Sequence, residues 1–124
     1  MMNQEIKQKW IEALRSGSYS QTKQQLKKEN SFCCLGVLCD LYLKENNQDW
    51  VIQGNDAGVI VHDEEEYYMP LIEVAVLPEK VYTWAGLDEE NPEVEYAEQI
   101  MPISDVNDLG RSFKEIASII EHQL

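Results

Sequence analysis

The chain has 124 residues, of which 44% are hydrophobic, and this is the size and composition of one globular domain with a sizeable core. Its formal net charge is −13, distributed unevenly, since residues 1–30 carry +3 and residues 31–124 carry −16. The negative electrostatic field over most of such a protein repels nucleic-acid phosphates and acidic membrane surfaces, and it attracts basic protein surfaces. We therefore expect neither direct nucleic-acid binding nor membrane binding.

The sequence also indicates a compartment. The first ten residues lack the apolar run of a secretory signal, and no apolar stretch is long enough to span a bilayer. The three cysteines, Cys33, Cys34 and Cys39, lie close together in one apolar stretch, which favours reduced thiols over a disulfide framework. These features predict a protein of the cytoplasm.

An amphipathic helix is predicted near residues 3–16. Its apolar positions recur at helical spacing around Trp10, and Gly17 is suited to end it in a left-handed conformation. Residues 18–31 are polar and contain the only locally basic region. This segment is either a half-buried extended stretch that uses Leu26, or a solvated connection.

The longest apolar run predicts a buried central helix over residues 32–44. A helix that is apolar on nearly every side belongs in the middle of a domain. Ser31 stands where an N-cap is expected, and Asn46 or Asn47 can end the helix in a left-handed turn. Gly36, inside the run, marks a close approach by a neighbouring element.

The following region changes to a strand-like pattern. Residues 50–52 and 59–61 are predicted strands on either side of a turn, and residues 71–77 could supply a third strand. A short helix over 78–85 has Pro78 at its first position and Gly86 beyond its end, with Leu87 folding back on Tyr82. Residues 94–96 are expected to form a charged edge strand.

A terminal amphipathic helix is predicted over residues 113–123. Ser112 and Glu115 have the spacing of a capping box, and residues 103–109 precede them as one helical turn closed by Gly110. The whole chain, residues 1–124, is thus expected to be a single compact α+β domain. It has about four helices around the buried central helix, packed on a small, mostly antiparallel sheet from residues 50–100.

The sequence offers little for metal or cofactor chemistry. Asp105 and Asn107 have the spacing of the first two ligands of a calcium-binding EF-hand loop, but Leu109 and Ile116 occupy positions where that loop needs oxygen ligands. The cysteines lack the paired spacing of a zinc site. We expect no metal and no cofactor.

One enzyme hypothesis follows from the thiols. A cysteine in the first turn of a helix has its thiolate stabilised by the helix dipole, so Cys33 or Cys34 could act as a nucleophile. His62 could then serve as the base, with Asp63 or Asn55 to orient it, as in a cysteine hydrolase. The alternative is that all three cysteines are small buried hydrophobic residues.

The aromatic residues suggest a binding site. Tyr82 and Trp84 could form a stacking wall for a base-like ligand, with Asn107, Asp108 and Arg111 as polar contacts. The alternative for each tryptophan is core packing.

Several stretches of the chain together resemble a known group of sequences. They are residues 10–21, residues 77–92, residues 107–117 and the run Cys-Cys-Leu-Gly-Val-Leu-Cys-Asp at residues 33–40. This pattern resembles a family of small proteins encoded by tailed bacteriophages and prophages. Members usually carry glycines before the central helix, where this chain has Thr22, Gln24 and Gln25. The resemblance implies no catalytic residues; it implies a protein that binds a host component.

We therefore expect a non-enzymatic, phage-type binding protein that counters a host process in the bacterial cytoplasm. Its ligand would be a small nucleotide-like immune signal held in the aromatic-lined pocket. One alternative is an acidic inhibitor that occupies the basic surface of a host nucleic-acid-binding enzyme, and another is the cysteine hydrolase. The sequence is compatible with a monomer and with a homo-oligomer.

Overall fold

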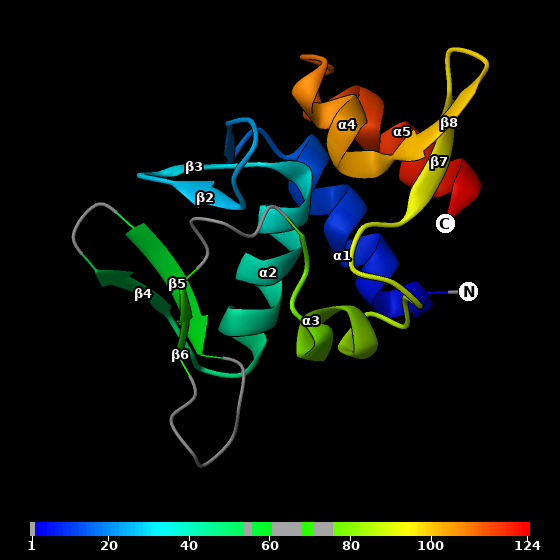
Figure 1. Ribbon diagram of the computed structural model, residues 1–124. Coiled ribbons are helices and arrows are strands. Elements are labelled where there is room, and N and C mark those ends of the chain that lie inside the picture. Colours follow the sequence, from blue (N-terminus) through cyan, green and yellow to red (C-terminus); the bar gives the residue numbers. More distant parts are fainter. Residues whose placement is uncertain (1, 54–55, 61–67, 71–75) are drawn as a thin grey trace.

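The computed structural model describes residues 2–53, 56–60, 68–70 and 76–124. Figure 1 shows one helix, α2, in the middle, with the other elements arranged around it. The α+β fold in one compact domain is confirmed, but the strands form three small sheets instead of one. The helices are α1 (Gln4–Arg15), α2 (Cys34–Glu45), α3 (Glu79–Trp84), α4 (Ile103–Asp108) and α5 (Phe113–Gln123). The strands are β1 (Ser20–Gln21), β2 (Lys27–Lys28), β3 (Ser31–Phe32), β4 (Trp50–Gln53), β5 (Asp56–Ile60), β6 (Tyr68–Pro70), β7 (Glu93–Tyr96) and β8 (Gln99–Pro102).

Helix α2 is buried as the sequence predicts, because neighbours cover nearly every side of it. It contacts α1, α3, α4 and β3. The indole of Trp10, itself fully buried, donates a hydrogen bond to the carbonyl of Cys34 across 2.9 Å and so fixes α1 on the start of α2. At the other end, Asn47 adopts a φ of 55°, which confirms the expected left-handed turn after the helix.

The start of α2 differs from the prediction. The N-cap is Cys33, whose sulfur accepts the backbone N–H of Gly36 at 3.4 Å, and Ser31 lies in strand β3 instead. The backbone of β3 pairs with β1 on one side and β2 on the other. The Phe32 ring also packs against Tyr19 at 5.2 Å between centroids. These contacts hold the chain extended for two residues beyond Ser31, so the predicted cap is wrong.

The polar segment before α2 is fixed on the helix instead of being a solvated connection. Leu26 is fully buried, and its carbonyl oxygen accepts the N–H of Cys33 at 3.2 Å. A Cβ on Gly36 would lie 2.6 Å from the carbonyl carbon of Leu26, and closer still to its oxygen. The predicted close approach at Gly36 is therefore confirmed. Gln24 has a φ of 67°, in the left-handed region that glycine adopts most readily.

A three-stranded sheet at one side of the molecule joins β4 to β5 and β5 to β6, both antiparallel (Figure 1). It confirms a hairpin that begins at Trp50, but the second strand starts at Asp56, inside the predicted turn, and residue 61 lies outside the described residues. The third strand, β6, ends at Pro70, and residues 71–75 of the strand expected there lie outside the described residues.

Two helix termini follow the sequence closely. Gly86 has a φ of 76°, and the N–H of Leu87 donates to the carbonyl of Tyr82 at 2.8 Å, which confirms the fold-back after α3. The Ser112 hydroxyl accepts the N–H of Glu115 at 3.2 Å and caps α5. The carboxylate of Glu115 does not complete the capping box, because it accepts the hydroxyl of Tyr96 at 3.0 Å instead.

The β7–β8 hairpin projects from the body near the end of α5 (Figure 1). Its two-residue turn, Ala97–Glu98, has positive φ at both positions, 52° and 67°. The side-chain amide of Gln123 covers the outer edge of β7. It accepts the N–H of Glu95 at 2.7 Å and donates to the same residue's carbonyl at 2.9 Å. The hairpin is thereby held against α5.

Candidate functional site

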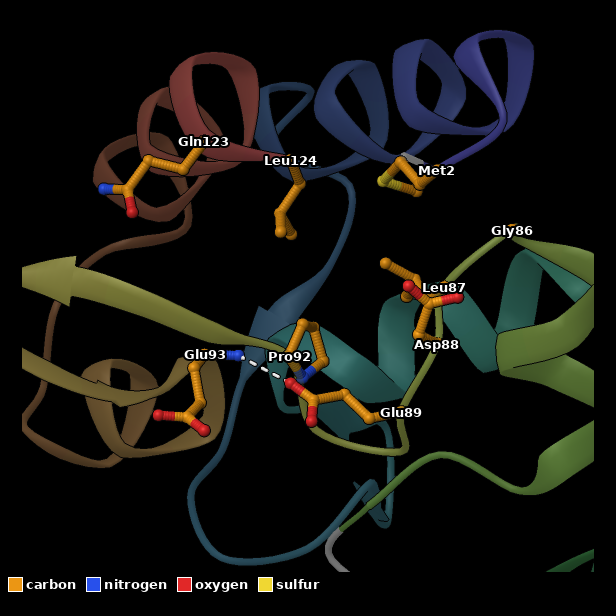
Figure 2. A pocket seen from close by; sticks show the side chains of 9 residues that line it. All are labelled: Met2, Gly86, Leu87, Asp88, Glu89, Pro92, Glu93, Gln123 and Leu124. Carbon is orange, nitrogen blue, oxygen red and sulfur yellow. Dashed lines mark hydrogen bonds between the residues drawn. The ribbon is translucent and has the colours of Figure 1, made fainter.

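A cavity lies where the beginning of the chain, the α3–β7 connection and the end of α5 meet (Figure 2). Its volume is about 360 Å³, at the small end of the range of ligand-binding cavities. We call it the acid-rimmed cavity, and it is lined by Met2, Gly86, Leu87, Asp88, Glu89, Pro92, Glu93, Gln123 and Leu124.

The backbone turn at Gly86 brings the parts of this cavity together. Its positive φ ends α3, and a Cβ there would lie 2.7 Å from the backbone nitrogen of Asn3. That nitrogen donates to the carbonyl of Ala85 at 2.8 Å, so the beginning of the chain is held directly against the end of α3. Only glycine combines this φ with so close an approach.

The lining combines apolar walls with negative charge. In Figure 2, Leu124 reaches into the space from α5, while Pro92 lies below it and Leu87 faces it from the other side. One oxygen of Glu89 accepts the backbone N–H of Glu93 at 3.2 Å, which fixes this carboxylate beside Pro92. Three carboxylates and no basic side chain line the cavity, so it disfavours anions and attracts cations.

Of the two residues expected to form an aromatic wall, Tyr82 and Trp84, only Trp84 lines the cavity at the C-terminal end of α2. Trp84 and Tyr42 meet edge to face with ring centroids 5.3 Å apart. They line a second cavity of about 380 Å³ together with Asn46, Glu79, Lys80 and Thr83. Tyr82 is half-buried against the core and is not among the lining residues.

The expected polar contacts lie at the N-terminal end of α2. Asn107 is fully buried, and its side-chain oxygen accepts the N–H of Cys34 at 3.2 Å and the amide of Gln21 at 2.9 Å. Its side-chain nitrogen donates to the carbonyl of Thr22 at 2.8 Å. Asn107 thus joins three segments of the chain and has no polar atom left over for a ligand.

Asp108 and Arg111 are also engaged within the fold. Asp108 accepts the N–H of Gln24 at 2.9 Å, and the Arg111 guanidinium lies over the Tyr96 ring at 5.7 Å. Asp108 also lines a cavity among the described residues. That third cavity, of about 360 Å³, is formed by Gln99, Met101, Asp105, Asp108 and Leu109.

The structure therefore does not bring the predicted site residues together. Cys34, at the start of α2, donates its N–H to Asn107, one of the predicted polar contacts, whereas Tyr42, two turns later, contacts Trp84. Eight residues of helix separate these contacts, a rise of about 12 Å.

The thiols have the environment of structural residues. Cys33 is 2% exposed, and burial raises its pKa to about 11. Burial also raises the pKa of Cys34 and of Cys39 well above the ordinary value, because a thiolate is costly without water. These shifts oppose the activation that a cysteine hydrolase requires, and His62, the expected base, lies outside the described residues.

The described part of the chain contains no cluster of three or more histidine, cysteine or acidic side chains able to hold a metal ion. Among the same residues, no helix has the length and apolar character needed to cross a bilayer.

Sequence reasoning missed the acid-rimmed cavity. It predicted Gly86 as a helix end, and this residue borders the cavity. The run Asp88-Glu89-Glu90 could have indicated an acidic rim. The contributions of Met2 and Leu124 depend on the packing of α1 against α5, for which no local pattern exists.

Comparison with curated proteins and with solved structures found no match for this chain. A family model, described as Domain of unknown function (DUF8296), matches residues 2–124, which is nearly the whole chain. The chain therefore belongs to the DUF8296 family.

Proposed function

We propose that this protein is a non-enzymatic binding protein that counters a host process by occupying a basic surface on a host protein. The acid-rimmed cavity carries the proposal, because it joins apolar walls to carboxylates without a basic side chain in its lining. An interface of this kind gains apolar burial at its centre and charge attraction at its rim.

The acids around the cavity are available to a partner. Residues 88–98 contain six exposed carboxylates: Asp88, Glu89, Glu90, Glu93, Glu95 and Glu98. The ion pairs recorded among the described residues join Lys9 to Glu45, Arg15 to Glu121 and Lys44 to Asp40, so none of them neutralises this segment. Ile100, 73% exposed on the same hairpin, adds an apolar contact beside the charges.

The biological setting is proposed from the resemblance to phage proteins. A small, acidic protein produced during infection would act in the cytoplasm of its bacterial host. A basic surface that normally holds DNA or RNA is its natural target, because an array of carboxylates competes with phosphates there.

A second candidate is capture of a small nucleotide-like ligand. The cavity between α2 and α3 favours it, since Trp84 and Tyr42 offer aromatic surface and Lys80 a positive charge. The acid-rimmed cavity and the cavity formed with Asp105 and Asp108 have carboxylates but no basic side chain in their linings, so they suit phosphates poorly. Thermal-shift measurements with mono-, di- and cyclic nucleotides test this candidate, and Trp84→Ala should abolish any shift.

Salt dependence tests the leading proposal. Tagged protein would be used to recover partners from lysate of a bacterial host at low salt, with elution by rising salt. We expect a basic host protein that is released before about 1 M salt, where the Debye length falls to about 3 Å. Retention of a partner unchanged at that salt, or recovery of a bound nucleotide alone, contradicts the proposal.

A further inference from the structure

The acid-rimmed cavity has the features of a pocket for one side chain with an apolar stem and a cationic head. Leu124 and Pro92 face its interior, while Asp88 and Glu89 place carboxylates around the same space (Figure 2). Arginine matches this combination, because its methylenes pack on apolar walls while its planar guanidinium bonds carboxylates through several donors.

We propose that the acid-rimmed cavity receives an arginine side chain from the partner protein. The inference rests on the proposed function and identifies the point of contact. One carboxylate is already positioned, since Glu89 is held by the N–H of Glu93, and Asp88 is exposed and makes no recorded hydrogen bond or ion pair among the described residues. A positioned acceptor loses little freedom when the guanidinium binds.

The third cavity, between β8 and α4, has the same volume but fits a cation less well. Its Asp108 already accepts the backbone N–H of Gln24 at 2.9 Å. The Lys23 ammonium lies 3.5 Å from the position of a Cβ on Gly110, directly after Leu109 of that cavity, and so supplies positive charge beside it. No basic side chain lines either cavity, but the acid-rimmed cavity has three carboxylates in its lining against two in the third cavity, so it attracts a cationic occupant more strongly.

The experiment titrates the protein with N-acetyl-arginine amide and follows the backbone amide resonances by NMR. N-acetyl-citrulline amide, which has the same shape without the charge, is the matched ligand control. We expect arginine to shift the amides of Gly86 to Glu89, of Glu93 and of Gln123, and citrulline to leave them in place.

Three variants separate the contributions of charge and apolar contact. Asp88→Asn should weaken arginine binding about fivefold through loss of a charge-assisted hydrogen bond, and Leu124→Ala should weaken it about threefold through loss of apolar contact. Glu98→Gln removes the same charge from the hairpin turn outside the cavity, and it should change the affinity by less than about twofold.

The outcomes distinguish this inference from the proposed function. Shifts spread over other acidic surfaces, or equal effects of Asp88→Asn and Glu98→Gln, overturn the arginine pocket and leave the function standing. If wild-type protein binds neither arginine amide nor the basic protein protamine at low salt, both proposals fail.

Discussion

Replacement of Asn107 by alanine tests whether this buried residue holds the fold together or contacts a ligand. Its side chain, fully buried, accepts hydrogen bonds from Cys34 and Gln21 and donates to the carbonyl of Thr22. Alanine leaves the N–H of Cys34 and the carbonyl of Thr22 without these partners. Each orphaned buried group costs about 1–3 kcal/mol, so we expect a total loss of about 2–6 kcal/mol in the free energy of unfolding.

A loss of that size is large against the stability of an ordinary domain, about 5–15 kcal/mol. Urea denaturation followed by tryptophan fluorescence would measure it as a fall in the transition midpoint. The matched control is Asn91→Ala. Asn91 also makes two side-chain hydrogen bonds, to the hydroxyl and N–H of Ser104, but it is only half-buried. Because water can replace its bonds, the control should cost about 1 kcal/mol.

Equal stability losses in the two variants would refute this account of Asn107. A variant of Asn107 that keeps its stability but loses a bound ligand would restore the ligand-contact role that the sequence suggested.

Three further predictions concern the helix contact, the hairpin turn and acid sensitivity. Gly36→Ala should destabilise by at least about 3 kcal/mol in the same denaturation assay, because its methyl group would overlap the backbone of Leu26; a near-neutral result contradicts the observed contact. Ala97→Asn combined with Glu98→Gly should raise the free energy of unfolding by about 1 kcal/mol, since both positions have positive φ; no gain argues against this turn. Burial works to raise the pKa of Asp40, but hydrogen bonds from Tyr19, Trp50 and Lys44 outweigh it and lower that pKa. The ionised Asp40 carboxylate therefore contributes its full stabilisation above its unfolded pKa of about 3.9, and this contribution is lost as the pH falls through the lower folded pKa. The difference in free energy of unfolding between wild type and Asp40→Asn should accordingly shrink below about pH 4. A difference that stays constant from pH 7 to pH 2 refutes this.

The elements that sequence patterns predicted well are those controlled by local chemistry. Gly86 and Gly110 adopt positive φ after short helices, as glycines beyond a helix end commonly do. Ser112 caps α5 through its own side chain, three residues from its partner N–H. The buried central helix followed from apolar character alone, because a segment without a polar face has to lie inside the domain.

The features that sequence patterns missed depend on contacts between distant segments. Ser31 has a suitable side chain for a helix cap, but sheet pairing with β1 and β2 holds it in β3. The sequence left Leu26 in either a half-buried stretch or a solvated connection, and the space at Gly36, which lets the Leu26 backbone pack on the central helix, decides between them. Such pairings are decided by tertiary packing, which overrides the local preference of a single residue.

The sequence indicated the acidic character of the candidate site, but none of the predicted site residues lines the acid-rimmed cavity. Sequence reasoning identified aromatic and polar side chains suited to binding, but it could not tell that Trp84 and Asn107 pack at opposite ends of α2. It did identify the excess of acids, and the structure places six exposed ones within residues 88–98. Composition thus indicated the chemistry of the surface, and the cavity within it required the fold.

Co-purification of wild-type protein beside a charge-reduced variant tests the central claim most directly. The variant replaces Glu90, Glu93, Glu95 and Glu98 by glutamine, which removes four exposed carboxylates and preserves the shape of the side chains. The account predicts that a basic host protein is recovered with the wild type at low salt and is largely lost from the variant. Recovery of the same protein in equal amounts by both would contradict it.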